Sequence, residues 1–283
     1  MSVCVRARVC LCVSVCVCAS TQDPETEVRA GAAKSVSGYY DLVGNDRFVS
    51  EVVPAVRELA ADTALPVRSA LAVAVMEVAG KMPAVSASAH MLPLVMQFLR
   101  DDAAEVCVCV CVCLCVCACA CCSPLFTPPC SRSQVRQKVL ESLDKVVVTV
   151  GADVVRESVV PVVAGVVTDS QWRVRERVLD QLPLLAEHLG VGVFDDRLLP
   201  IYLTSYHDQV TAVRLAATRQ LQPIAACLGA DWCAAKLLPK LVDFYNSGAN
   251  YQQRITVLYA VQVHVAREHT LDFPKDAVRR HRA

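Results

Sequence analysis

One repeat period, of about 40 residues, organises the sequence. Val-Arg pairs mark this period, and they begin at Val28, Val67, Val135, Val174 and Val213, at successive steps of 39, 68, 39 and 39. Prolines that follow an aliphatic residue recur with the same steps, at Pro54, Pro93, Pro161, Pro200 and Pro239. An Asp stands eight residues after each of the first four prolines, and Ser247 takes that place after the fifth. A fixed period of this length predicts stacked structural repeats, not a closed globule.

Each repeat is predicted to be a pair of helices joined by a short polar turn, as residues 194–229 illustrate. The first helix carries an apolar stripe of Leu198, Leu199, Tyr202 and Leu203, and the second carries Val210, Val213, Ala217, Leu221 and Ile224. Asp208 is expected to accept a hydrogen bond from a free backbone N–H where the second helix begins. Gly229 is expected to end that helix. The Arg of each Val-Arg pair is expected to bind the loop Asp of a neighbouring repeat.

Helix pairs of this kind bury their apolar faces only by packing on neighbouring pairs, which predicts an all-α solenoid. Paired helices with such a period are typical of the HEAT and armadillo class. The order of Asp followed by Val-Arg favours HEAT, since armadillo repeats usually have a third helix. We therefore predict a HEAT-repeat α-solenoid of about five to six helix pairs.

The one irregular step, between Val67 and Val135, is too long by the length of the Cys- and Val-rich segment from Val106 to Gln134. Removing this segment joins DDAAE to VRQKVLESL and restores the period. Alternating Val and Cys are encoded by a GT dinucleotide repeat read in frame, and SPLFTPPCS before Gln134 can be encoded by a pyrimidine-rich tract like that before a splice acceptor. We interpret residues 106–134 as a retained intron and the similar residues 1–22 as intron-derived.

This interpretation defines the expected organisation of the chain. HEAT repeats occupy residues 23–105 and 135–262, on either side of the 106–134 insert. Residues 263–283 form a divergent tail without a further turn or proline mark, and we expect the array to be a truncated part of a longer solenoid.

Other roles for the Cys-rich segments fit the sequence less well. Strict alternation directs successive cysteines to opposite faces of a strand, which disfavours disulfide staples, and no Cys-x-x-Cys pair with a His partner supports a metal site. The 17 apolar residues from Val106 to Cys122 reach the lower limit for a membrane-spanning helix, but a crossing there would split a repeat. For residues 1–22, Arg6, Arg8 and the following apolar run leave a secretory signal peptide as an alternative.

Only two cysteines, Cys227 and Cys233, lie in the repeats, both on apolar helical stretches. We expect each of them to be a small buried hydrophobic residue. This usage favours a cytoplasmic protein, with the nucleus left open as a second compartment.

A more specific resemblance begins at Ser170 and runs to Pro200, where the sequence reads SQWRVRERVLDQLPLLAEHLGVGVFDDRLLP. These residues resemble the scaffold A subunit of type 2A protein phosphatase, a HEAT-repeat family. The motifs that carry the resemblance are Trp172–Arg175, Pro183–Ala186 and Leu189-Gly190. It continues through AVRLAATRQL and NYQQR, and upstream through EVRAGAAKSV and VRSALAVAVMEVAGK, so that it covers residues 23–262 apart from the insert.

In that family the turns within the repeats line up as a ridge that binds the phosphatase catalytic subunit on late repeats and regulatory subunits on early ones. The resemblance implies a ridge formed here by Gln171, Trp172, Arg173, Gln209, Val210, Thr211, Asn250, Tyr251 and Gln252. Thr211 departs from the aromatic residue that the family often has at this position. Trp, Tyr and Arg are the residues that dominate protein interfaces. Packing of Trp172 onto its own repeat is the alternative role for that side chain.

The sequence offers little for catalysis. It has no Gly-rich phosphate loop, His-Glu-x-x-His motif or nucleophile elbow, and its histidines have no metal-ligand spacing. Lys plus Arg and Asp plus Glu both number 28, so no basic excess attracts nucleic acid or a membrane. We predict a non-catalytic scaffold without cofactor or metal, whose partners are phosphatase catalytic and regulatory subunits. Another HEAT adaptor, such as a regulatory subunit of a related phosphatase or a transport factor, is the alternative.

Overall fold

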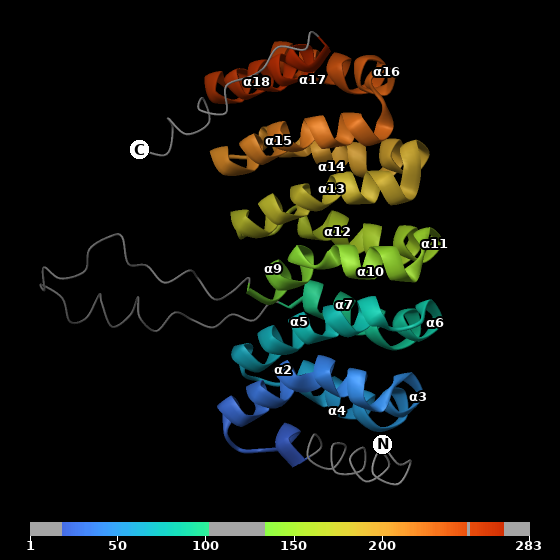
Figure 1. The fold of residues 1–283 in the computed structure, drawn as a ribbon. Coiled ribbons are helices and arrows are strands. Elements are labelled where there is room, and N and C mark those ends of the chain that lie inside the picture. The colour runs from blue at the N-terminus through green and yellow to red at the C-terminus, as the bar shows by residue number, and fades with distance from the viewer. Residues whose placement is uncertain (1–18, 102–133, 248–249, 269–283) are drawn as a thin grey trace, which may run out of the picture. The chain divides into compact units, whose positions relative to one another are not determined.

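The computed structural model describes residues 19–101, 134–247 and 250–268, with side chains as far as Gln262 in the last helix. Within these ranges the chain is helical and contains no strand (Figure 1). It divides into two compact units, Met1–Val166 and Val167–Ala283. The predictions for residues 1–18, for 102–133 and for the tail after residue 268 concern parts of the chain outside the described residues.

The first helix of every repeat contains a π-helical turn just before the recurrent proline. In the first unit these helices are α3 (Asn45–Arg47), η1 (Phe48–Val52) and α4 (Val53–Ala60); α6 (Ala84–Ser86), η2 (Ala87–Met91) and α7 (Leu92–Leu99); and α11 (Ala152–Val154), η4 (Val155–Val159) and α12 (Val160–Val166). A proline has no N–H and its ring collides with the carbonyl four residues earlier. The helix widens to avoid this collision, and the N–H of Val53 therefore donates to Phe48, five residues back.

The second helices of the first unit are α2 (Thr26–Val43), α5 (Leu65–Lys81) and the pair α9 (Gln134–Glu141) and α10 (Leu143–Val150). Helix α5 contacts α2 on one side and α9 and α10 on the other (Figure 1). The faces that meet are fully buried at Val36, Val67, Leu71, Val75 and Val139. Each second helix therefore buries its apolar stripe against its neighbours, as expected for stacked repeats.

The second unit repeats this arrangement. Its elements are α13 (Trp172–Val193), η5 (Phe194–Leu198), α14 (Leu199–Thr204), η6 (Ser205–His207), α15 (Thr211–Leu228), α16 (Ala230–Trp232), η7 (Cys233–Leu237), α17 (Leu238–Asn246) and α18 (Tyr251–Glu268). Helix α15 contacts both α13 and α18 (Figure 1). The described residues contain five first helices and six second helices, which confirms the predicted all-α repeat fold and the number of helix pairs.

The stripes predicted for residues 194–229 are buried in the structure. The fully buried members are Leu198, Leu199, Tyr202, Val213, Ala217, Leu221 and Ile224, whereas Leu203 and Val210 are half-buried. Gly229 ends α15 with φ 97°, a conformation that glycine adopts without steric cost. Asp208 does accept a backbone N–H, from Val210 at 2.8 Å, but it stands two residues ahead of the N-cap residue because the helix begins only at Thr211.

The expectation for the two repeat cysteines is right for one of them. Cys233 is buried, but Cys227 is exposed because it lies outside the stripe of Leu221, Ile224 and Leu228 that faces the core of α15. Although the side chain is exposed, nearby protein atoms partly desolvate its thiol, and this desolvation, together with the carboxylate of Glu187, raises the pKa of Cys227. None of the described helices is both long enough and apolar enough to cross a membrane.

Candidate protein-binding surface on the turns of the second unit

Arginine–aspartate pairs connect the turn of one repeat to the turn of the next. Nε of Arg29, Arg68 and Arg175 contacts one carboxylate oxygen of Asp62, Asp101 and Asp208 at 2.6, 2.7 and 2.6 Å, and each Asp follows its Arg by 33 residues. Nη2 of the same arginines donates to the other carboxylate oxygen at 3.2, 3.4 and 2.9 Å. These three bidentate pairs, here called the Arg–Asp ladder, confirm the predicted tie between neighbouring repeats for these arginines. The prediction is wrong for Arg214, whose Nε and Nη2 contact Thr256, Thr211 and Gln252 instead of a loop Asp.

The third donor of each arginine binds the turn of its own repeat. Nη1 of Arg175 donates to the carbonyl of Asp169 at 2.6 Å, and Nη1 of Arg68 donates to that of Asp62 at 2.6 Å, in both cases six residues earlier. Arg136 makes the same contact with the carbonyl of Asp101 at 2.7 Å, although 35 residues separate the two. This separation exceeds the usual six residues by the length of the segment 106–134. The geometry on both sides of this segment is thus that of an uninterrupted repeat, which supports its interpretation as an insertion.

The carboxylates of Asp62 and Asp208 stay ionised because two donors compensate for their burial. Burial by itself raises the pKa of Asp208, but the hydrogen bonds from Arg175 and from the N–H of Val210 outweigh it, and the pKa lies below its usual value. The pKa of Asp62 shows the same balance, with Arg29 and the N–H of Ala64 as donors. The turns are therefore held together by ionised side chains that are largely shielded from solvent.

The first predicted turn of the second unit presents an aromatic and a cationic side chain together. Trp172 is half-buried and Arg173 is exposed, with the guanidinium carbon of Arg173 4.6 Å from the centre of the indole ring. Gln171 is half-buried, and its backbone N–H donates to Asp169 at 2.7 Å. The indole is thus half-buried, and a cation lies over its ring.

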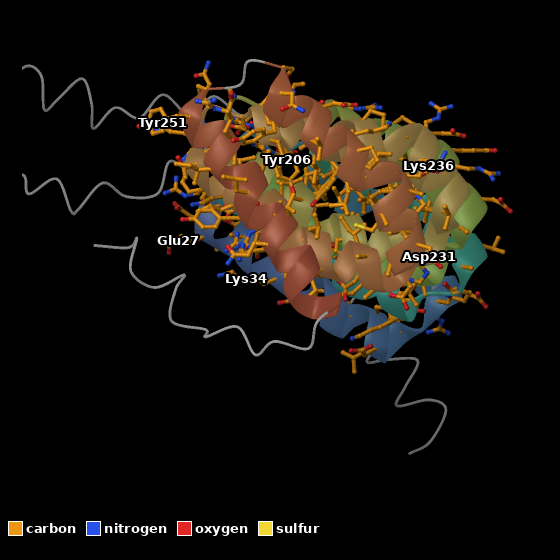
Figure 2. The ribbon with its side chains drawn as sticks, turned by 90° about the horizontal axis from the view of Figure 1, so that it is seen from above. Glu27, Lys34, Tyr206, Asp231, Lys236 and Tyr251 are labelled. Atoms are coloured by element: carbon orange, nitrogen blue, oxygen red, sulfur yellow. The ribbon has the colours of Figure 1, made fainter. Side chains whose placement is uncertain are left out.

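The second and third turns are more polar. Gln209 and Thr211 are exposed and Val210 is half-buried, while the hydroxyl of Thr211 accepts a hydrogen bond from Arg214 at 3.0 Å. In the third turn Asn250 and Gln252 are exposed, and Tyr251 exposes 65% of its surface. Figure 2 shows Tyr251 at one edge of this unit, with Asp231 and Lys236 at the opposite edge.

Hydrogen bonds join the three turns to one another. Arg175 links the first turn to the second through Asp208. Gln253 links the third turn to the second, since its side-chain amide donates to the carbonyl of His207 at 3.2 Å. Gln253 and Asn250 also exchange side-chain and backbone hydrogen bonds at 2.9 and 3.0 Å, a capping box that starts α18. Sequence reasoning missed Gln253. The ladder position in α18 is that of Arg254, whose backbone N–H donates to the carbonyl of Asn250 as the N–H of Arg214 donates to that of Val210.

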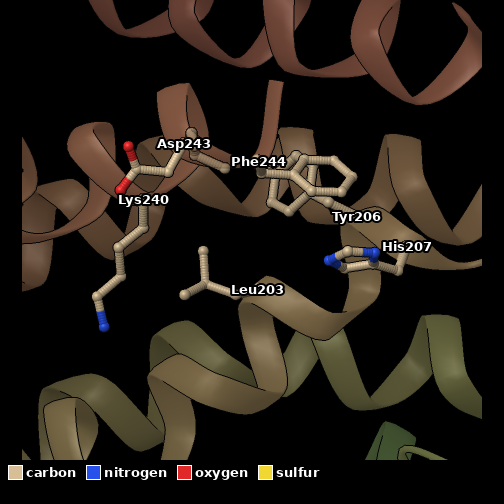
Figure 3. Close-up of a pocket in the computed structure, with 7 residues that line it drawn as sticks. Leu203, Tyr206, His207, Lys240, Asp243 and Phe244 are labelled. Atoms are coloured by element: carbon tan, nitrogen blue, oxygen red, sulfur yellow. The ribbon is translucent and has the colours of Figure 1, made fainter. Parts of the chain in front are cut away.

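A cavity of about 250 Å³ lies beside the second turn (Figure 3). It is formed between the end of the α14–η6 segment and α17, and its lining residues are Leu203, Tyr206, His207, Lys240, Leu241, Asp243 and Phe244. The rings of His207 and Phe244 pack with their centres 4.2 Å apart. Lys240 and Asp243 are exposed at the rim. The sequence offered no sign of this cavity, because its two halves come from different repeats.

Comparison with known proteins agrees with a helical-repeat fold. A model of the PPP2R1A-like HEAT repeat matches residues 13–82, beginning ten residues before the boundary predicted at residue 23. No curated protein matches the sequence.

Among solved structures, that of Cex1p resembles the chain with a TM-score of 0.62 and 13% identity, over 96% of this chain and 46% of Cex1p. The chain thus spans about half the length of that structure. An engineered protein from the Northeast Structural Genomics Consortium aligns over 90% of this chain and 96% of its own, at a TM-score of 0.47 and 14% identity. These findings show that the chain contains a PPP2R1A-like HEAT repeat within an all-α helical-repeat fold.

Proposed function

We propose that the chain is a non-catalytic scaffold that binds the catalytic subunit of a serine/threonine protein phosphatase through the turns of its second unit. Regulatory subunits would bind turns of the earlier repeats, in the cytoplasm or nucleus. The observation that carries the proposal is the set of three turns that salt bridges and hydrogen bonds hold together, with Trp172, Arg173 and Tyr251 at their surface. The resemblance from Ser170 to Pro200 and the PPP2R1A-like match support this class of partner.

The arrangement is physically suited to binding a protein. Aromatic and Arg side chains bury a large area and make hydrogen bonds at their edges, and they carry most of the energy in many interfaces. Because Arg175 and Gln253 already fix the turns, little backbone entropy is lost when a partner binds. The stacking of Arg173 on Trp172 also orients both side chains before the partner arrives.

Binding of a purified type 2A catalytic subunit to the full chain, measured by calorimetry, tests this proposal. Replacing both Trp172 and Tyr251 by Ala removes the half-buried indole and the exposed phenol of the turns, and we expect the Kd to rise by about tenfold or more. Tyr259→Ala is the matched control, since Tyr259 is 45% exposed but lies eight residues into α18, away from the turns. Equal affinities of the double variant and the unmodified chain, with unchanged circular dichroism, would refute the proposal.

A further inference from the structure

The two ends of the described array carry the two halves of one ladder pair. The backbone N–H of each ladder arginine donates to the carbonyl of the residue just before its second helix, as Arg175 does to Gln171, and the N–H of Arg254 donates to that of Asn250 at 3.0 Å. Arg254 is therefore the ladder arginine of α18, the last second helix among the described residues. Its side chain is exposed, and the part of the chain that the structure describes holds no carboxylate in contact with it.

Asp23 has the position of a ladder aspartate at the other end of the array. Its Oδ1 accepts the N–H of Glu25 at 2.8 Å, and its carbonyl accepts from Nη1 of Arg29 at 2.8 Å. Asp62 makes the same two contacts, with the N–H two residues later at 2.8 Å and with Nη1 of Arg68 at 2.6 Å. Asp62 also binds an arginine of the preceding repeat, Arg29, whereas none of the described residues presents such an arginine to Asp23. Asp23 is thus a ladder aspartate without its second arginine.

Burial along the array shows which apolar position faces the following repeat. The residue four places after the arginine of each Val-Arg pair is at most 6% exposed, at Ala33, Ala72, Leu140, Leu179 and Thr218. Leu258 holds this place in α18 and is 53% exposed. Because α18 differs from the earlier second helices in having no described helix after it, this place is one that the following repeat covers.

A second position faces the preceding repeat. The Val of the Val-Arg pair is at most 2% exposed at Val67, Val135, Val174 and Val213. Gln253 replaces this Val in α18, and its side chain donates to the carbonyl of His207 in the preceding turn at 3.2 Å. In α2, however, Val28 is 42% exposed. Val28 therefore stands where a repeat touches the one before it, close to Asp23 in the same turn.

We propose that α18 of one copy of this chain binds the first turn of a second copy, residues 23–28, and that Arg254 and Asp23 form a bidentate pair across the junction. Leu258 and Val28 become buried in the same contact, as their equivalents are inside the array. Stacked repeats interact with their immediate neighbours, so a junction of two copies makes the same kinds of contact as a junction of two repeats. This inference does not depend on the proposed phosphatase partner.

The charges favour a second copy as the occupant and set its orientation. The guanidinium at one end of the array matches the carboxylate at the other end in sign and in bidentate geometry. Contact between like ends brings Arg254 against Arg254, or Asp23 against Asp23, and like charges across an interface weaken it. The junction is therefore head to tail. It joins two different surfaces, so every open assembly keeps one free end of each kind and grows unless it closes into a ring.

Sedimentation velocity of the full chain tests the junction, in a reducing buffer because the chain has 17 cysteines that could cross-link copies. We expect the average mass to rise above that of a single chain as the concentration increases. Arg254→Glu and Asp23→Arg each place like charges at the junction, and each should weaken association by about tenfold or more. Asp23→Asn keeps an oxygen for the N–H of Glu25 and should weaken association less. A chain that stays monomeric up to its solubility limit, or one whose association survives both charge reversals, would overturn the proposal.

Mixing the two charge-reversed chains separates the junction from a loss of folding. The Arg254→Glu chain retains Asp23 and the Asp23→Arg chain retains Arg254, so an equimolar mixture re-forms the original pair. We expect the mixture to associate more strongly than either chain alone, and the double variant, which exchanges the two charges, to do so as well. No gain in mass on mixing would overturn the pairing of Arg254 with Asp23.

The apolar part of the junction has its own test. Leu258→Lys places a charge where Leu258 is buried by the second copy, and we expect association to weaken by about tenfold. Leu42→Lys is the matched control, because Leu42 is 60% exposed and its equivalent, Cys227, stays exposed although α15 has neighbours on both sides. It should leave association unchanged. Equal effects of the two substitutions on association, with unchanged circular dichroism, would contradict the proposed junction.

Discussion

Arg175 and Asp208 form a bidentate pair between consecutive turns, with Nε–Oδ2 at 2.6 Å and Nη2–Oδ1 at 2.9 Å. The side chains are only 17% and 10% exposed, so the pair lies in surroundings drier than those of an ordinary surface ion pair. The same arginine holds the carbonyl of Asp169 in its own turn. One residue therefore sets the relative positions of two turns, and the exposed residues on those turns depend on it.

Removing the ladder arginine should cost much more stability than removing a surface arginine. We expect Arg175→Met to lower the free energy of unfolding by about 2–4 kcal/mol, because Asp208 is left half-buried without its main partner. Arg219→Met removes a pair with Glu176 whose arginine is 51% exposed, and we expect a loss below about 1 kcal/mol. Trp172 and Trp232 both lie in the second unit, so fluorescence during urea unfolding reports this unit directly. Equal losses for the two variants would contradict the role of the ladder.

The ladder should also make the second unit sensitive to acid. The pKa of Asp208 is lower in the folded chain than its ordinary value of 3.8, so at and just below that pH the unfolded chain binds more protons than the folded chain. The stability contributed by Asp208 is thus present above pH 3.8 and is lost as the pH falls through the lower, folded-state pKa. In urea titrations at several pH values, Asp208→Asn should be less stable at neutral pH and lose less stability below about pH 4. Parallel curves for the variant and the unmodified chain would show that Asp208 does not contribute.

Two buried tyrosines form a second polar contact inside the second unit. The hydroxyl of Tyr202 donates to the carbonyl of Ala217 at 2.7 Å and lies 3.0 Å from the hydroxyl of Tyr206. Tyr202→Phe removes this link, and we expect a loss of about 1–2 kcal/mol in the free energy of unfolding. Tyr259→Phe, at a residue 45% exposed, is the control and should change stability little. The prediction fails if the two substitutions have the same effect.

The same two tyrosines should make the second unit lose stability at alkaline pH. Burial raises the pKa of both Tyr202 and Tyr206 above the usual 10.0, so their contribution to stability is complete below pH 10 and declines as the pH rises above it. In a titration followed by ultraviolet absorbance, we expect two tyrosines to ionise only together with unfolding. Ionisation of all seven tyrosines before the loss of helical signal would contradict this expectation.

Deleting residues 106–134 should leave the repeats folded. Arg136 already contacts Asp101 as the arginine of an uninterrupted repeat does, and shortening the connection changes its closure entropy by only about 1 kcal/mol. We expect cooperative unfolding and a retained helical signal in circular dichroism. Deleting residues 65–93, an equally long piece that contains all of α5, is the control and should abolish cooperative unfolding of the first unit. Loss of helix after the first deletion would show that the segment belongs to the repeat.

The sequence alone was sufficient to determine the periodic features of this protein. A side chain that recurs once in every period meets the same neighbours in each repeat, so the helix pairs, the buried stripes and the pairing of Arg175 with a loop Asp could all be predicted. The ending of α15 at Gly229 followed for a similar reason, since few other residues adopt a positive φ. The candidate turn residues were found by resemblance to a family, and the sequence shows their order along the chain but not their contacts.

Only the tertiary structure decided the features that arise between repeats. The cavity at His207 and Phe244, the link from Gln253 to His207 and the exposure of Cys227 depend on how one helix lies against another, and no single repeat encodes that packing. The π-helical turns before the prolines resulted from a collision between a proline ring and a carbonyl, which a pattern of apolar residues does not record. The contacts of Arg214 with Thr211 and Gln252 likewise became visible only in the structure, because a period identifies the position of a side chain but not the partner that it finds there.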